Sequence, residues 1–120
     1  MGLTYVTVAV KPHLDSADEY QAQFLVDTGA IDSMAPRDGL PSAGVKPVGE
    51  AVYELASGEF VEYEFGLGTI QFMGEITSGR IIFGPDGCEP LLGATALDSV
   101  GILVDAGRQT LKRLPAIPLK

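Results

Sequence analysis

Apolar and polar residues alternate along much of this chain, and the alternation predicts a series of short β-strands. The first runs from Thr4 to Val10, where valines at positions 6, 8 and 10 fall on one face, because successive side chains of a strand point to opposite sides. Tyr20 to Val26 predicts a second strand, and Ile31 to Ala35 a short third one. The polar segment 12–19 reads as a turn, and segment 36–44, with its prolines and glycines, as a turn or short helix.

The middle of the chain predicts a β-hairpin. Val52 to Leu55 and Phe60 to Phe65 flank the short stretch 56–59, a spacing typical of two antiparallel strands joined by a tight turn. In the second arm apolar and aromatic residues alternate with glutamates, so one side of the hairpin is expected to face water. Further strands are predicted from Gly66 to Met73 and from Glu75 to Phe83.

The last part of the chain adds one short helix. A turn is predicted over residues 84–87, and Ala94 to Val100 predicts a helix that Gly101 ends. Two strands, Ile102 to Val104 and Gln109 to Leu114, follow. Many short strands with a single short helix indicate a mostly β domain that is closed or sandwich-like.

Length and charge narrow the range of functions. At 120 residues the chain is expected to form one domain over residues 1–120. Its formal net charge of −8, from 16 acidic and 8 basic residues, argues against a nucleic-acid partner, which requires basic patches. No apolar run approaches the roughly 20 residues that cross a bilayer, and the first residues show no secretion signal. A cytoplasmic protein with no membrane partner is therefore expected.

Cysteine and histidine are too few for a Cys/His zinc site within one chain. Cys88 is the only cysteine and His13 the only histidine, so the sequence offers neither a disulfide framework nor a Cys/His zinc site. No metal and no cofactor are predicted. A lone cysteine also fits a reducing cytoplasm, and His13 is expected to be a solvated loop residue.

The strongest candidate for chemistry is the segment Phe24-Leu25-Val26-Asp27-Thr28-Gly29-Ala30. Three apolar residues, suited to a buried strand, run directly into a carboxylate, a hydroxyl and a glycine. An acid this close to an apolar run is costly to desolvate unless something hydrogen-bonds it. Gly29 lets the backbone come close and Ala30 adds little bulk. The segment therefore predicts one carboxylate held rigidly at the end of a strand, with space in front of it.

Asp27-Thr28-Gly29-Ala30 resembles the active-site loop of aspartic proteases, and two further elements resemble those of the retroviral-type members. Glu89-Pro90-Leu91-Leu92-Gly93 is similar to the apolar-apolar-Gly element before their short helix, and the predicted hairpin lies where that family carries its flap. The three elements occur in the family's order and cover roughly residues 3–114. The resemblance implies a small, closed, barrel-like acid protease fold with one short helix, and aspartic peptidase activity.

The single Asp-Thr-Gly in 120 residues points to a homodimer. Peptide hydrolysis by carboxylates needs two of them, one ionised to take a proton from water and one protonated to polarise the scissile carbonyl. A two-fold axis supplies the second carboxylate from an identical chain. The resemblance implies the same arrangement, with Asp27 of each subunit facing its mate across a peptide or protein substrate.

The resemblance also assigns roles to the residues that follow Asp27. Thr28 would hydrogen-bond to the opposing loop and lock the two subunits together. Gly29 would present its backbone to the substrate, and Ala30 and Asp32 would line the cleft. All four roles depend on the dimer or on a bound peptide.

Two further segments would complete the site by resemblance. Ser57 and Gly58, at the hairpin tip, would close over an extended peptide that pairs as an added strand. Leu91-Leu92-Gly93 would pack beneath the active loop. An ordinary hairpin turn accounts for Ser57 and Gly58 nearly as well as a flap does, because any β protein needs such turns.

The chain departs from the retroviral pattern at two positions. Viral enzymes usually place Asp after Asp-Thr-Gly-Ala and Arg after the later apolar-apolar-Gly, and these two pair near the dimer interface. Here Ile31 and Ala94 stand at those positions, so both partners are missing and no charge is left alone. The mutual loss is consistent with a bacterial or other cellular branch of the fold.

Two alternatives stay open at this point. A weak dimer would leave each Asp27 without its partner, and the chain would then be a catalytically weak or inactive peptide-binding module of the same fold. Alternatively the motif is coincidental, and the chain is a structural or assembly domain with Asp27 far from any cleft.

Overall fold

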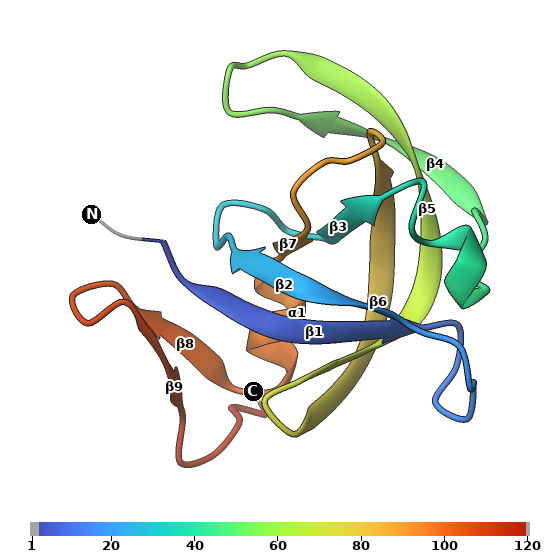
Figure 1. The fold of residues 1–120 in the computed structure, drawn as a ribbon. Coiled ribbons are helices and arrows are strands. Elements are labelled where there is room, and N and C mark those ends of the chain that lie inside the picture. The colour runs from blue at the N-terminus through green and yellow to red at the C-terminus, as the bar shows by residue number, and fades with distance from the viewer. Residues whose placement is uncertain (1–2, 120) are drawn as a thin grey trace.

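The computed structural model describes residues 3–119 of the chain. This part contains nine β-strands, one α-helix and one 3₁₀ helix (Figure 1). The mostly β character and the short α-helix expected from the sequence are confirmed. The strands are β1 (Tyr5–Lys11), β2 (Tyr20–Val26), β3 (Ser33–Pro36), β4 (Gly49–Glu54), β5 (Phe60–Phe72), β6 (Glu75–Gly84), β7 (Leu91–Leu92), β8 (Ile102–Asp105) and β9 (Thr110–Arg113). The helix α1 spans Ala94–Ser99 and the 3₁₀ helix Pro41–Ala43. No helix among residues 3–119 has the length and apolar character needed to cross a bilayer.

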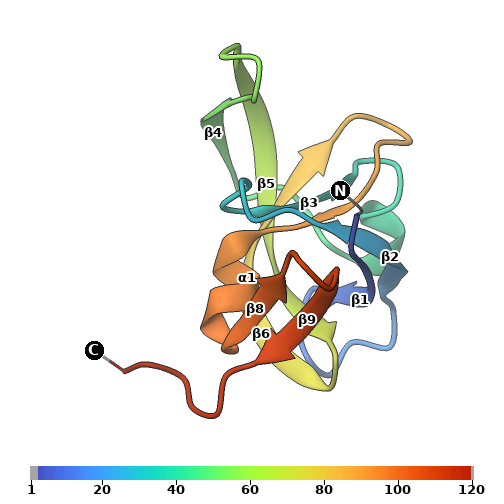
Figure 2. The ribbon, with the colours of Figure 1, turned by 90° about the vertical axis from the view of Figure 1, so that its left-hand side faces the viewer.

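Seven of the strands form one sheet that closes on itself. Their order is β1-β2-β7-β3-β6-β5-β4, and an additional pairing between β1 and β5 joins the first six into a sheet ring. β4 pairs with β5 alone among the described residues, so it lies outside the ring at a free edge. Figure 2 shows the β4–β5 hairpin projecting from the body of the molecule, while β8 and β9 form a separate two-stranded sheet.

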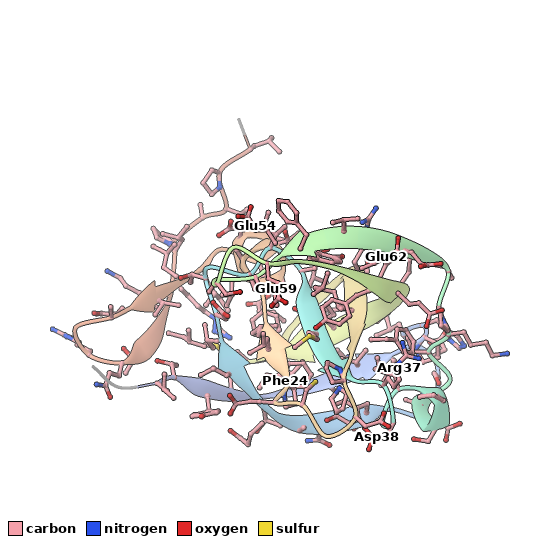
Figure 3. All side chains as sticks on the ribbon, turned by 90° about the horizontal axis from the view of Figure 1, so that it is seen from above. Phe24, Arg37, Asp38, Glu54, Glu59 and Glu62 are labelled. Atoms are coloured by element: carbon pink, nitrogen blue, oxygen red, sulfur yellow. The ribbon has the colours of Figure 1, made fainter. Side chains whose placement is uncertain are left out.

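The core fills the inside of the sheet ring. Val8 and Val10 of β1 are fully buried, as the alternation in that strand predicts. Phe24 of β2 (labelled in Figure 3) is also fully buried. Its aromatic ring meets that of Tyr20 edge-on, with 6.2 Å between the centroids. From α1, Leu97 packs into the same cluster, so the helix and the sheet share one core.

β5 is longer than the sequence indicated. The prediction of separate strands over 60–65 and 66–73 is wrong, because β5 is continuous over 13 residues and curves strongly along its length (Figure 1). Gly66 and Gly68 are buried, and a Cβ at these positions would lie 2.7 Å from the backbone oxygen of Lys46 and 2.8 Å from that of Lys11, respectively. These glycines therefore let neighbouring backbone approach the strand closely, and they do not end it.

Two strand boundaries also differ from the prediction. β3 begins at Ser33, later than expected, because the carbonyls just before it accept hydrogen bonds from α1. β4 begins at Gly49, earlier than expected, because its pairing with β5 continues to that residue. α1 ends at Ser99, one residue before the predicted end, and Gly101 follows the C-cap residue Val100 with a left-handed φ of 71°, as expected of a glycine that ends a helix.

Two neighbouring glutamates of the hairpin, Glu50 and Glu62, are expected to make the stability of the protein depend on pH. A hydrogen bond with Glu62, which is labelled in Figure 3, and then the repulsion between the two charges raise the pKa of Glu50. A carboxyl whose pKa is raised by folding holds its proton more tightly in the folded state, so its contribution to stability is lost as pH rises through that pKa. We expect Glu62→Gln to raise the urea midpoint of unfolding at pH 7 and to leave it unchanged at about pH 3.5, below the ordinary pKa of glutamate.

The control for this experiment is Asp86→Asn, which removes one negative charge from an exposed turn. Both variants change the net charge equally, so a general charge effect would move both midpoints. An equal gain from Asp86→Asn at pH 7, or a gain from Glu62→Gln that persists in acid, would contradict the prediction.

Candidate active site

Asp27 stands at the end of β2, beside β7. The last residues of β2 pair in parallel with Leu91 and Leu92, and the backbone N–H of Asp27 donates to the carbonyl of Leu92 at 3.0 Å. The Asp27 side chain turns back on its own loop, where Oδ1 accepts the N–H of Gly29 at 3.0 Å. Asp27 as a whole residue is half-buried. It is thus held by backbone groups at the end of a strand, as the sequence predicted.

The turn that leads from β7 into α1 anchors the loop from behind. The N–H of Gly93 donates to Oγ of Ser33 at 2.9 Å, and Ser33 is only 2% exposed. The next two N–H groups, of Ala94 and Thr95, donate to the carbonyls of Ala30 and Ile31 at 2.7 and 3.1 Å. These donors, which the first turn of a helix leaves without an intrahelical partner, here fix the position of the loop. Residues 91–93 pack against it as expected.

A cleft of about 710 Å³ opens between this loop and the hairpin. One wall is formed by Asp27 and residues 29–32, and the opposite wall by residues 51–56 of the first hairpin arm. Met34, Ile82 and Leu91 add apolar surface between them. The cleft therefore joins the candidate carboxylate to an exposed strand edge, since β4 is the arm that pairs on one side only.

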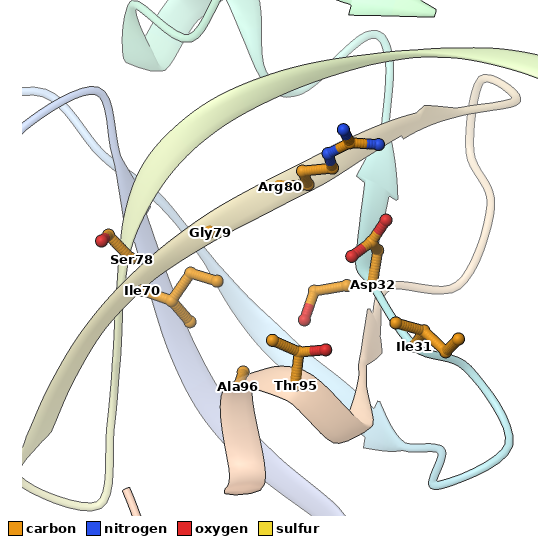
Figure 4. Close-up of a pocket in the computed structure, with 9 residues that line it drawn as sticks. Ile31, Asp32, Ile70, Ser78, Gly79, Arg80, Thr95 and Ala96 are labelled. Carbon is orange, nitrogen blue, oxygen red and sulfur yellow. The ribbon is translucent and has the colours of Figure 1, made fainter. Parts of the chain in front are cut away.

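A much smaller hollow of about 10 Å³ lies behind the loop (Figure 4). Residues of the loop, of β6 and of α1 enclose it, and it shares Ile31, Asp32 and Arg80 with the main cleft. Its volume is about that of one water molecule's accessible space, so the main cleft is the one with room for a substrate.

The structure brings together some of the predicted site residues and leaves others apart. Asp27, Gly29, Ala30 and Asp32 all line the main cleft. Thr28 is exposed and lies outside the lining, which leaves its hydroxyl accessible to another chain.

Ser57 and Gly58 occupy the hairpin tip, away from the lining of the cleft. Gly58 has a φ of 88° and donates its N–H to the carbonyl of Leu55 at 2.8 Å, while Ser57 Oγ accepts the N–H of Glu59 at 3.3 Å. Both residues therefore serve the tight turn in this single chain. The hairpin reaches the cleft through its first arm, residues 51–56.

Two cleft residues, Tyr53 and Arg80, were missed by the sequence reasoning. The Tyr53 hydroxyl donates to Oδ2 of Asp32 at 2.8 Å and so ties the hairpin to the loop. Burial, the hydrogen bond to Asp32 and its charge raise the pKa of Tyr53, and the cation of Arg80 acts in the opposite direction. The sequence held only weak signals for these two residues. The alternation of β4 places Tyr53 on the opposite face from Val52, and Arg80 is the one charged residue in segment 76–85.

Removing the Tyr53 hydroxyl is expected to loosen the link between hairpin and loop. We expect Tyr53→Phe to lower the free energy of unfolding by about 1–2 kcal/mol, the usual contribution of a part-buried hydrogen bond to a charged acceptor, as measured by urea denaturation. Tyr63→Phe is the matched control, because Tyr63 also lines the cleft and its hydroxyl makes no side-chain hydrogen bond within residues 3–119. Equal losses from the two variants would contradict the assigned role of Tyr53.

Comparison with protein-family models found no match for this chain, and comparison with curated proteins found none either. Within residues 3–119, no three His, Cys, Asp or Glu side chains gather in a way that could hold a metal ion. The arguments about function therefore rest on the residues of the cleft and their geometry.

Proposed function

We propose that this chain is an aspartic endopeptidase of the retroviral type, a cytoplasmic homodimer in which Asp27 of each subunit forms the catalytic pair. The observation that carries the proposal is the position of Asp27. It lies at the end of β2, with its carboxylate held by the N–H of Gly29, and it lines a cleft of about 710 Å³ beneath a projecting hairpin. An aspartate that only stabilises a turn would not need a cleft in front of it.

The proposed chemistry follows from two carboxyl groups held close together. Like charges resist ionising together, so one carboxyl keeps its proton and the pair titrates as a unit. The ionised member takes a proton from a water molecule, which attacks the scissile carbonyl, while the protonated member polarises that carbonyl oxygen. Proton transfer to the leaving amine then completes hydrolysis. We expect an acid-leaning pH profile for such a pair.

The free edge of β4 supports binding of an extended peptide. A strand with one unpaired edge offers a row of backbone N–H and C=O groups that a peptide can join as an added strand. Residues 51–54 of this strand line the cleft across from the Asp27 loop. A peptide paired there would run between the hairpin and the carboxylates, with apolar surface from Met34 and Ile82 beside it.

The test of the proposed assembly is sedimentation combined with a crystal structure and an activity assay. A dimer with the Asp27 carboxylates within hydrogen-bonding or water-bridging distance of each other, together with pepstatin-sensitive cleavage of peptides, is the expected result. Carboxylates well apart across every two-fold axis would contradict it.

A second candidate function is a peptide-binding module that keeps the fold and does not cleave. The observation that favours it is Ile31, which is 71% exposed and lines the cleft. Viral enzymes usually have an acid at this position, which pairs with an arginine near the dimer interface. In this chain Ala94 stands at the position of that arginine. A chain that stays monomeric at high micromolar concentration and binds peptides without cutting them would favour this candidate over the peptidase.

A further inference from the structure

Arg80 differs from the other arginines of the chain in its surroundings. Each of the others has a guanidinium nitrogen within 4.0 Å of a carboxylate: Arg37 of Glu64, Arg108 of Asp105 and Arg113 of Glu75. Among residues 3–119, no carboxylate lies within that distance of the Arg80 guanidinium. Its charge is therefore not matched by an ion pair within the described part of the chain.

The Arg80 side chain is nevertheless held in place. It belongs to β6, and it points to the same face as Ile82, two residues on, so both line the cleft. The guanidinium carbon lies 4.0 Å from the centre of the Phe65 aromatic ring. Stacking on an aromatic face orients the planar fork of donors. Part of this fork faces the Tyr53 hydroxyl, but a guanidinium has five N–H donors, more than one hydroxyl can accept.

The charges around the cleft make Arg80 unusual there. The other charged residues in the lining are Asp27, Asp32 and Glu54, all acids, and Arg80 is the one cation among the described residues that line it. One oxygen of Asp32 already accepts the Tyr53 hydroxyl. Figure 4 shows Arg80 and Asp32 coming from different elements, β6 and the segment before β3.

We propose that Arg80 is a specificity residue of the cleft and binds a carboxylate of the substrate peptide. The inference rests on the proposed function, because it takes the cleft to be the peptide site. A carboxylate matches the guanidinium fork in geometry and charge, and it can accept two parallel hydrogen bonds. The carboxylate comes either from an Asp or Glu side chain or from the end of a peptide, and the experiment separates these sources.

The experiment measures peptide binding to the Asp27→Asn protein, so that the probe is not consumed. The probes are fluorescein-labelled decapeptide pools with an amidated C-terminus, in which Glu or Gln is fixed at each position in turn. A further pool has Gln at these positions and a free C-terminal carboxylate. We expect the Glu pool to bind about tenfold more tightly than the Gln pool at one position, the usual effect of a charge-assisted hydrogen bond, as read by fluorescence anisotropy.

Variants of Arg80 in this background decide the assignment. Arg80→Met keeps an apolar contact with Phe65 and is expected to abolish the preference, and Arg80→Lys, which keeps the charge without the fork, is expected to retain part of it. Arg108→Met is the control, since that side chain is 85% exposed and lies outside the cleft lining. Circular dichroism of each variant verifies that it is folded.

The outcomes separate this inference from the proposed function. An Arg80-dependent preference for the free C-terminal pool assigns the carboxylate to the peptide end. Equal binding of all pools, or a preference that survives Arg80→Met, would overturn the inference even if the wild-type protein cleaves peptides. An Arg80-dependent preference in a protein that cleaves nothing would overturn the peptidase alone, and a failure of every pool to bind would overturn both.

Discussion

Replacing Asp27 with Asn is expected to lower the rate of peptide cleavage about 10³-fold or more, within the range that a positioned acid or base contributes, while the fold stays intact. An amide can neither take a proton from water nor give one to the carbonyl oxygen. Its oxygen can still accept the N–H of Gly29, now 3.0 Å from the Asp27 carboxylate. The loop should therefore keep its shape, and the loss should reside in the chemical step. Cleavage of a fluorogenic peptide library, with thermal melting and sedimentation of the same samples, measures both properties.

Asp105→Asn provides a closely matched control. Asp105 also ends a strand, β8, and is also followed two residues later by a glycine, Gly107. Its Oδ1 accepts the N–H of Arg108 at 3.2 Å, but it lies outside the cleft lining. We expect this variant to cleave at the wild-type rate. Full activity in Asp27→Asn would end the peptidase proposal, and equal losses in both variants would show that the loss does not come from Asp27 chemistry.

The local features of this fold were predictable from the sequence because they depend on neighbouring residues. Strict alternation predicted β1 to within one residue at each end, and the apolar run that stops before Asp27 predicted the end of β2 and a carboxylate directly after it. The helix ended where a glycine can adopt a left-handed φ. In each case the signal and the structure lie within the same few residues.

The features that were missed depend on contacts between distant segments. Gly66 looked like the boundary between two strands, and only the approach of the Lys46 backbone shows why a glycine is needed inside β5. The hydrogen bond from Tyr53 to Asp32 joins residues 21 apart in the chain, and it depends on how far the hairpin leans over the loop. Arg80 likewise became a cleft residue only through the register of β6. Periodicity fixes the face of a strand but not which loop that face meets.

The largest expected effect on stability is at Gly93, where the start of α1 anchors the loop that carries Asp27. Gly93 has an extended backbone, with φ of −89° and ψ of 171°, so any residue could adopt its conformation, and the need for glycine is one of space. A Cβ there would lie 2.7 Å from the carbonyl carbon and oxygen of Asp32 and from the carbonyl oxygen of Ile31. Since backbone atoms cannot rotate away as a side chain can, the loop or the helix must shift.

We therefore expect Gly93→Ala to lower the free energy of unfolding by about 3 kcal/mol, the upper part of the usual range for overpacking. Cleavage should fall by more than the unfolded fraction explains, because the N–H groups of residues 93–95 hold the loop that carries Asp27. Urea denaturation measures the loss of stability, at one fixed protein concentration so that any dimerisation stays constant. Cleavage rates, taken at urea concentrations well below the unfolding transition, measure the loss of activity.

Gly79→Ala is the control, since a Cβ at that position of β6 would meet nothing within 4 Å, and its free energy of unfolding should stay within about 0.5 kcal/mol of the wild type. If Gly93→Ala were as stable and as active as Gly79→Ala, the contact between the helix start and the loop would not be what positions Asp27.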